Sequence, residues 1–228
     1  MDDAVKLLNA VSALIAAVIL PVVVLMIFRM FRIEINAFIH RANRFAVKGG
    51  GLDISIDAQQ AQVHSAIEKA YEKVAASPEE TDTRAVDASA AASMATSTVT
   101  PAVVQKASAS TILWVDNHPE NNVYERRALE AIGSTIVLAK STDEGLAKAR
   151  DQAFDVIISD MGRGLDRTAG YTLLEKLRKS GIETPFLIYA GSAKPELRAE
   201  ARKRGAVDAT NRPDELFQLV VSVLNSRD

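Results

Sequence analysis

Two stretches of the chain decide its fold: ILWVDN at 112–117 and DVIISD at 155–160. Each is a run of large apolar residues that ends on an acid, Asp116 in the first stretch and Asp160 in the second. A strand buried on both faces of a parallel sheet has such a continuous apolar run, and sites form beyond its carboxyl end. The two stretches therefore predict two parallel strands that carry acidic side chains at the same edge of a sheet.

Strand-like and helical segments alternate regularly around these two stretches. The strand-like runs are 111–115, 135–139, 155–160, 185–190 and 206–210, and the helical runs lie near 120–132, 142–152, 170–180, 194–204 and 213–225. Five such units predict an α/β fold, a flavodoxin-like doubly wound five-stranded parallel sheet with helices on both faces. We therefore expect residues 111–228 to form one globular domain.

These 118 residues resemble the receiver domain of two-component response regulators. The motifs that carry the resemblance are VDN-P at 115–119, IISDM at 157–161, TP at 184–185, GA at 205–206 and Arg-Pro at 212–213. The resemblance implies that Asp160 is the phospho-acceptor, and that Asp116, Asp160 and the carbonyl of Gly162 hold Mg²⁺. These residue types suit the chemistry, because Mg²⁺ prefers oxygen ligands and phosphoryl transfer depends on positioning and charge neutralisation.

Three pocket positions depart from the family pattern. Asn117 replaces the second acid of the metal site, and Ala190 replaces the hydroxyl residue that grips the phosphoryl group. Arg212 replaces a lysine, and its longer planar guanidinium has a different reach. Ser192 lies two residues after Ala190 and could supply a hydroxyl if the loop bends inward. The changes predict a degenerate receiver whose pocket binds Mg²⁺ weakly.

The charged residues around the pocket admit other roles. Asp116 and Asp160 could only cap the loops that follow them, through hydrogen bonds. Arg163 and Arg167 lie in the loop GRGLDRTAG at 162–170, where they could recognise a phosphate or nucleotide beside the pocket or be solvated loop charges.

The N-terminal part predicts a membrane anchor. Residues 7–28 contain no charged side chain, and their 22 residues at about 1.5 Å each span about 33 Å, enough for a hydrocarbon core of about 30 Å. A cleaved signal peptide fits less well, because residues 1–6 are acidic and no cleavage site follows. Basic residues dominate the C-terminal flank. The positive-inside rule therefore predicts a single pass through the bacterial inner membrane, with 1–6 outside and the C-terminal domain in the cytoplasm.

Three segments connect the anchor to the sheet. Residues 29–57 predict an amphipathic helix on the lipid of the inner leaflet, or a plain extension of the anchor, and then a hairpin. Residues 58–76 predict a helix with a thin apolar stripe that permits self-association. Residues 77–110 are rich in Ala, Ser and Thr, and they predict a flexible, disordered linker.

Composition and motifs leave three hypotheses on function. The net charge of −2 argues against a nucleic-acid partner, and the absence of cysteine excludes disulfides and thiolate metal sites. The first hypothesis is a non-enzymatic, membrane-tethered signalling module that contacts a cytoplasmic protein. The second is a working phospho-acceptor switch that receives phosphate from a histidine kinase. The third is a nucleotide- or sugar-processing enzyme that uses Asp116, Asp160 and Arg163, for which the sequence offers no obvious catalytic base.

Overall fold

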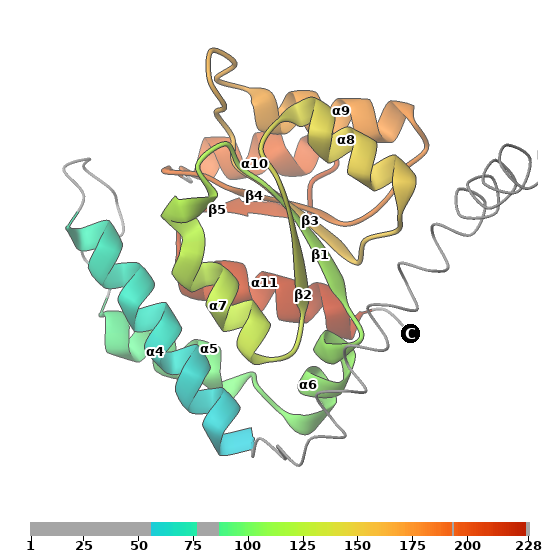
Figure 1. Ribbon diagram of the computed structural model, residues 1–228. Helices are drawn as coiled ribbons and strands as arrows, with labels where there is room; N and C mark the ends of the chain where they lie inside the picture. The colour runs from blue at the N-terminus through green and yellow to red at the C-terminus, as the bar shows by residue number, and fades with distance from the viewer. Residues whose placement is uncertain (1–55, 77–86, 193, 227–228) are drawn as a thin grey trace, which may run out of the picture. The chain divides into compact units, whose positions relative to one another are not determined.

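A five-stranded parallel sheet forms the centre of the protein. The computed structural model describes residues 56–76, 87–192 and 194–226 (Figure 1). The strands are β1 (Thr111–Val115), β2 (Thr135–Ala139), β3 (Val156–Ser159), β4 (Phe186–Tyr189) and β5 (Asp208–Thr210). They pair in the order β2-β1-β3-β4-β5, and every pair is parallel. The predicted doubly wound sheet is therefore confirmed.

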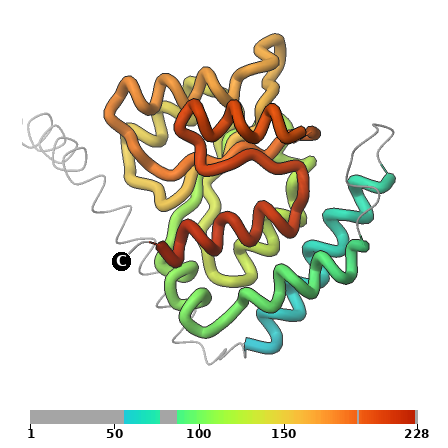
Figure 2. Tube along the Cα trace, turned by 180° about the vertical axis from the view of Figure 1, so that it is seen from behind, coloured from blue at the N-terminus to red at the C-terminus, as the bar shows by residue number. Residues whose placement is uncertain are grey.

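Helices cover both faces of this sheet. They are the 3₁₀ helix η3 (Pro119–Asn122) and the α-helices α7 (Val123–Ala131), α8 (Thr142–Asp151), α9 (Ala169–Lys179), α10 (Pro195–Lys203) and α11 (Pro213–Asn225). Helices α7 and α11 lie on one face, and α8, α9 and α10 lie on the other (Figures 1 and 2). Side chains of β1 alternate between the two cores: Ile112 and Trp114 face α7 and α11, whereas Leu113 and Val115 face α8 and α9.

Three further helices precede the sheet and pack on its α7–α11 side. They are α4 (Ile56–Ala75), α5 (Ala88–Ser97) and α6 (Pro101–Ser108). Figure 2 shows α4 and α5 side by side, with α4 running along α7. Their buried side chains belong to the same apolar cluster as Phe217 and Val220 of α11. These helices therefore share a hydrophobic core with the sheet.

The prediction of a disordered linker over 77–110 is wrong from residue 87 onward, where the chain forms α5 and α6. Alanine is the best helix former, and both helices are capped. The Asp87 carboxylate accepts hydrogen bonds from the amides of Ser89 and Ala90, and the Thr100 hydroxyl accepts one from Val103. Small side chains allow close packing, so this segment buries Ala91, Ala92, Ala95 and Ala107 although it has few large apolar groups. Residues 77–86 lie outside the described part.

Helix α4 confirms the helix predicted over 58–76 but begins two residues earlier. Ile56 and Asp57, which were expected to end a hairpin, form its first turn. The apolar stripe of Val63, Ile67 and Tyr71 is buried inside the chain against neighbouring helices. The stripe that suggested self-association is therefore occupied by contacts within the chain.

The other predictions for the N-terminal part lie outside the described residues. They concern the membrane span at 7–28, the juxtamembrane helix and the remainder of the hairpin. Within 56–76, 87–192 and 194–226, no helix combines the length and the apolar character that crossing a membrane requires.

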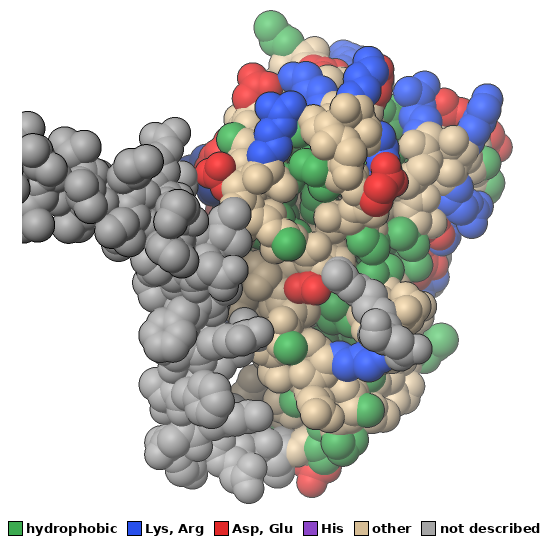
Figure 3. Space-filling model, turned by 90° about the vertical axis from the view of Figure 1, so that its right-hand side faces the viewer, with side chains coloured by type: hydrophobic (Ala, Val, Ile, Leu, Met, Phe, Trp, Pro, Cys, Tyr) green, Lys and Arg blue, Asp and Glu red, His purple; other side chains and the backbone are tan. Residues whose placement is uncertain are grey.

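The surface in Figure 3 carries both signs of charge, with lysine and arginine side chains interspersed with acids. The described residues form several surface ion pairs, among them Lys176 with Asp143 at 2.9 Å and Lys179 with Glu175 at 2.5 Å. That the protein has no nucleic-acid partner stays a prediction.

Candidate functional site

The two acids that end β1 and β3 line one cavity. Val115 pairs with Ser159 in the sheet, so Asp116 and Asp160 leave neighbouring strands at the same edge. The cavity has a volume of about 450 Å³ and lies beyond the carboxyl ends of the strands. Its position is the one that a parallel sheet favours for a site. The predicted juxtaposition of the two acids is thus present.

Asp116 is held by the loop that follows it. Its carboxylate accepts a hydrogen bond from the amide of His118 at 2.7 Å and another from the side-chain amide of Asn122. The residue is only 4% exposed. Asp116 therefore caps its loop, as the simpler interpretation expected, and also forms part of the cavity wall.

Asp160 is less tightly engaged and electrostatically perturbed. One carboxylate oxygen accepts a hydrogen bond from the Met161 amide at 2.7 Å. Burial, followed by repulsion from the Asp116 carboxylate, raises the pKa of Asp160 to about 6 from its ordinary value of 3.8. Two carboxylates that repel one another across a cavity form a site that a cation would stabilise.

The other residues expected at the pocket divide into two groups. Asn117, Gly162 and Ala190 line the cavity, whereas Ser192 and Arg212 are not among its lining residues. The Arg212 guanidinium points to α11, where it donates to Asp214 at 2.8 Å, and to α4, where it donates to the Tyr71 hydroxyl at 3.3 Å. The prediction that Ser192 and Arg212 line the pocket is therefore wrong in the described structure. Neighbouring Asn211 takes the place of Arg212 in the cavity wall.

Arg163 is also absent from the cavity wall, which corrects its assignment as a pocket residue. Its side chain is 7% exposed and inserts below the β3–α9 loop. It donates to the Ser159 hydroxyl at 2.6 Å, the Thr142 hydroxyl at 2.9 Å, and the carbonyls of Asp160 and Ala169 at 2.7 Å each. The guanidinium holds the loop behind the acceptor position, because protein acceptors bind both of its terminal NH₂ groups, whereas its Nε is buried without a partner among the described residues.

Comparison with known proteins gives the family of this half of the chain. Residues 112–223 match the family model of the response regulator receiver domain. This stretch is a receiver domain. The virulence sensor protein BvgS of Bordetella pertussis is 34% identical over 67 residues, which are 29% of this chain and 5% of that protein. The chain thus covers a small fraction of its curated relative.

Solved receiver domains are similar to this one. The receiver domain of the Francisella response regulator 1452 is 25% identical, with a TM-score of 0.48, over 52% of this chain and 99% of that one. The chemotaxis protein CheY4 of Vibrio cholerae is 26% identical, with a TM-score of 0.44, over 50% of this chain and 98% of that one. Receiver domains are typically non-enzymatic modules of two-component signalling that interact with histidine kinases and commonly bind Mg²⁺.

The acidic pocket of this receiver domain suits a divalent cation in its chemistry. Asp116, Asp160 and the Gly162 carbonyl are the groups that would hold Mg²⁺, and the repulsion between the two carboxylates shows that the pocket has an excess of negative charge. Within the described residues, however, no three His, Cys, Asp or Glu side chains lie close enough to surround one ion. Water molecules would have to complete the coordination, as Mg²⁺ readily permits.

Sequence reasoning missed a buried acid in the cavity wall. Glu125 of α7 is 5% exposed, and one of its carboxylate oxygens accepts a hydrogen bond from the Tyr189 hydroxyl at 2.9 Å. Burial raises the pKa of Glu125, and burial likewise raises that of Tyr189. A signal was available, because Glu125 precedes Ala128, Leu129 and Ile132 at i+3, i+4 and i+7 and so occupies a core-facing helix position.

Helix α4 supplies a second unexpected part of the wall. Ala70, Lys73 and Val74 line the cavity although they precede the receiver domain by almost forty residues. The Lys73 ammonium donates to the carbonyls of Glu120 at 3.0 Å and Asn121 at 2.7 Å, at the rim of the pocket. Nothing in the sequence of α4 indicated this contact, since it depends on how α4 packs along α7.

Proposed function

We propose that this protein is a degenerate receiver module that signals mainly through protein contacts at the inner membrane. The observation that carries the proposal is the position of Arg212. Its guanidinium is held by Asp214 and Tyr71 outside the cavity, and Ala190 has no hydroxyl to offer a phosphoryl oxygen. Neither group that would grip a phosphoryl at Asp160 is therefore available from the end of β4 or β5.

The membrane tether is the second element of the proposal. It rests on the uncharged run 7–28 and the basic residues after it. A receiver domain held at the cytoplasmic side would meet a membrane-bound histidine kinase at a raised local concentration. Contact with such a kinase or another membrane protein would then need little intrinsic affinity.

A working phospho-acceptor is the second candidate function. Its support is the shared cavity of Asp160 and Asp116, which suits a divalent cation. The enzyme hypothesis loses its main support, because Arg163, one of its three residues, is engaged by protein acceptors away from the cavity.

Phosphorylation of the full-length chain separates the two candidates. The chain is incubated with Mg²⁺ and acetyl phosphate, and intact mass measures the label. The contact module is expected to stay unlabelled. A variant that restores two expected groups, Asn117→Asp with Ala190→Thr, is expected to gain label at Asp160. Labelling of the wild type that disappears in Asp160→Asn would refute the contact proposal in favour of the phospho-switch.

The contact itself is tested with cells that contain the chain in their membranes. Cross-linking followed by mass spectrometry is expected to recover a histidine kinase or another signalling protein with wild type and Asp160→Asn alike. A recovery that depends on Asp160 would again favour the phospho-switch.

A further inference from the structure

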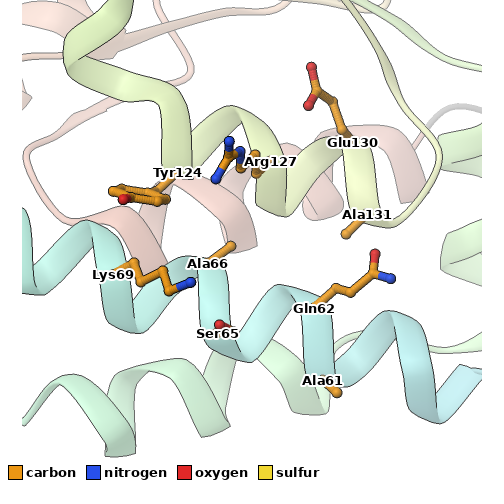
Figure 4. A pocket seen from close by; sticks show the side chains of 9 residues that line it. All are labelled: Ala61, Gln62, Ser65, Ala66, Lys69, Tyr124, Arg127, Glu130 and Ala131. Atoms are coloured by element: carbon orange, nitrogen blue, oxygen red, sulfur yellow. The ribbon is translucent and has the colours of Figure 1, made fainter.

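An open groove runs between α4 and α7. It has a volume of about 520 Å³ and is lined by side chains of these two helices (Figure 4). Ala61 and Ser65 of α4 and Ala131 of α7 have short side chains, which leave this space unfilled. The groove shares no lining residue with the acidic cavity. It is therefore a separate feature of the protein surface.

The charges along this groove are sorted by sign. Figure 4 shows Lys69 of α4 and Arg127 of α7 toward one end of the groove. Glu130 of α7 and Ala61 of α4 lie toward the other end. The acidic end continues on α4, because Asp57 lies about one turn before Ala61. Each helix therefore carries an acid at one end of the groove and a base at the other.

These charged groups have no ionic partner among the described residues. Their side chains are exposed, and none forms an ion pair with another described side chain; they are Asp57, Lys69, Arg127 and Glu130. The Arg127 guanidinium lies over the ring of Tyr124, with its central carbon 5.6 Å from the ring centroid, and this cation–π contact fixes its position in the groove. The charges at both ends are therefore available to a partner.

The order of these charges makes the groove complementary to itself. On α4 a row of side chains recurs every four residues along the helix: Asp57, Ala61, Ser65 and Lys69. Rows of this kind interdigitate when two helices pack. A two-fold rotation about the middle of the row brings Asp57 of one copy opposite Lys69 of a second copy, and the reverse. The same rotation places the acidic end of α7 opposite the basic end of the second groove.

We propose that the α4–α7 groove is a two-fold symmetric interface, in which a second copy of this chain packs its Asp57–Lys69 row against the same row of the first. Each dimer then has two symmetric ion pairs between Asp57 and Lys69. Arg127 and Glu130 add the same signs of charge at the same two ends. Ser65 lies beside the two-fold axis. The interface does not include the acidic cavity, so it stands whether or not Asp160 accepts phosphate.

A second copy fits this groove better than a partner of a single charge. A nucleic acid or an anionic lipid surface would attract Lys69 and Arg127 but would repel Asp57 and Glu130. A strongly basic partner would meet the opposite conflict. A surface that carries both signs in the reverse order satisfies both ends, and a rotated copy of the same groove is such a surface.

Cross-linking of single-cysteine variants of the full-length chain tests this interface. The chain has no cysteine, so each variant carries one reactive thiol. Ser65→Cys places that thiol beside the proposed two-fold axis and is expected to give a covalent dimer with a short bismaleimide. The control Ser97→Cys places an exposed thiol on α5, outside the groove, and is expected to give little dimer.

Charge reversal tests the pairing across the axis. Lys69→Glu, added to Ser65→Cys, leaves acids at both ends of the row and is expected to lower the dimer yield about fivefold or more. Adding Asp57→Lys as well restores opposite charges across the axis and is expected to return the yield to that of Ser65→Cys alone. The control Lys203→Glu changes an exposed lysine of α10 on the other face of the sheet and is expected to leave the yield unchanged.

Equal dimer yields from Ser65→Cys and Ser97→Cys, or a Lys69→Glu variant that dimerises as well as its parent, would overturn the proposal. Circular dichroism checks that the variants keep their helices, because Asp57→Lys places a positive charge at the N-terminal end of α4. If that variant does not fold, salt decides. Raising the ionic strength from about 0.05 M to about 0.5 M is expected to lower the yield of Ser65→Cys, and an unchanged yield would overturn the proposal. No phosphoryl group or kinase takes part, so failure here is distinct from failure of the proposed function.

Discussion

Asparagine in place of Asp160 is expected to stabilise the receiver domain at neutral pH. The folded protein holds this carboxyl where burial and the Asp116 charge raise its pKa to about 6 from 3.8. A raised pKa means that the folded state binds the proton more tightly than the unfolded state. The stability that this proton provides is complete below pH 3.8 and is lost as the pH rises through about 6. The variant keeps an oxygen that can accept the Met161 amide and removes the charge.

The size of the effect follows from the same pKa values. At about 1.36 kcal/mol per pKa unit, a rise from 3.8 to about 6 corresponds to about 3 kcal/mol above pH 6. Solvent reaches part of the carboxyl, so we expect about 1–2 kcal/mol. Asp160→Asn should therefore raise the free energy of unfolding by this amount at about pH 7.5 and by almost nothing at about pH 4.

Urea unfolding of the full-length chain, followed by Trp114 fluorescence, measures this difference at the two pH values. Asp143→Asn is the control, because its carboxylate is 87% exposed in a surface ion pair with Lys176 and should change stability by less than about 0.5 kcal/mol. The reasoning would be refuted if Asp160→Asn were less stable than the wild type at about pH 7.5. It would also be refuted if the variant changed the free energy of unfolding by the same amount at both pH values, because the Asp160 charge would then not destabilise the fold.

Three further substitutions test the packing around the site by thermal or urea unfolding. Tyr71→Phe removes the hydroxyl that donates to the buried Asp214 carboxylate, so we expect a loss of about 1–2 kcal/mol and faster proteolysis of α4; equal protection of α4 would contradict this. Arg163→Met leaves several loop acceptors unpaired and should lower the free energy of unfolding by about 3 kcal/mol. Its control, Arg167→Met in the exposed part of the loop, should lower it little. Similar losses in the two variants would show that Arg163 does not hold the loop in place. Gly145→Ala should cost about 1–3 kcal/mol, because a Cβ there would lie 3.0 Å from a Val115 methyl; an unchanged midpoint would show that β1 and α8 can separate.

The sheet and its flanking helices could be predicted because their signals are local. Apolar runs that end on acids mark buried parallel strands, and the five expected strands agree with the observed ones to within two residues. Strand adjacency then places Asp116 and Asp160 together without further information. Gly162, Asn117 and Ala190 follow from their positions next to these strand ends.

Side-chain direction and helix docking could not be predicted in the same way. Arg212 follows β5 as expected, but the pull of Asp214 and Tyr71 turns it from the cavity, and Tyr71 is 141 residues away in the chain. Arg163 fails for a similar reason, because its acceptors are gathered only when the β3–α9 loop folds over β3. Composition was misleading for α5 and α6, since an alanine-rich segment is apolar enough for a helix once α4 and α11 cover α5 and α11 covers α6.

The packing of α4, α5 and α6 on α11 limits how freely this receiver domain can be exchanged between proteins. The family match begins at residue 112, but the apolar side chains of α11, among them Phe217 and Val220, share one core with Ile67, Ala92 and Val103 from the preceding helices. A cassette cut at the family boundary would expose that face to water and favour aggregation. A transfer of this domain to another protein would therefore have to include α4, α5 and α6 together with the sheet. The folding unit is longer than the stretch that matches the family model.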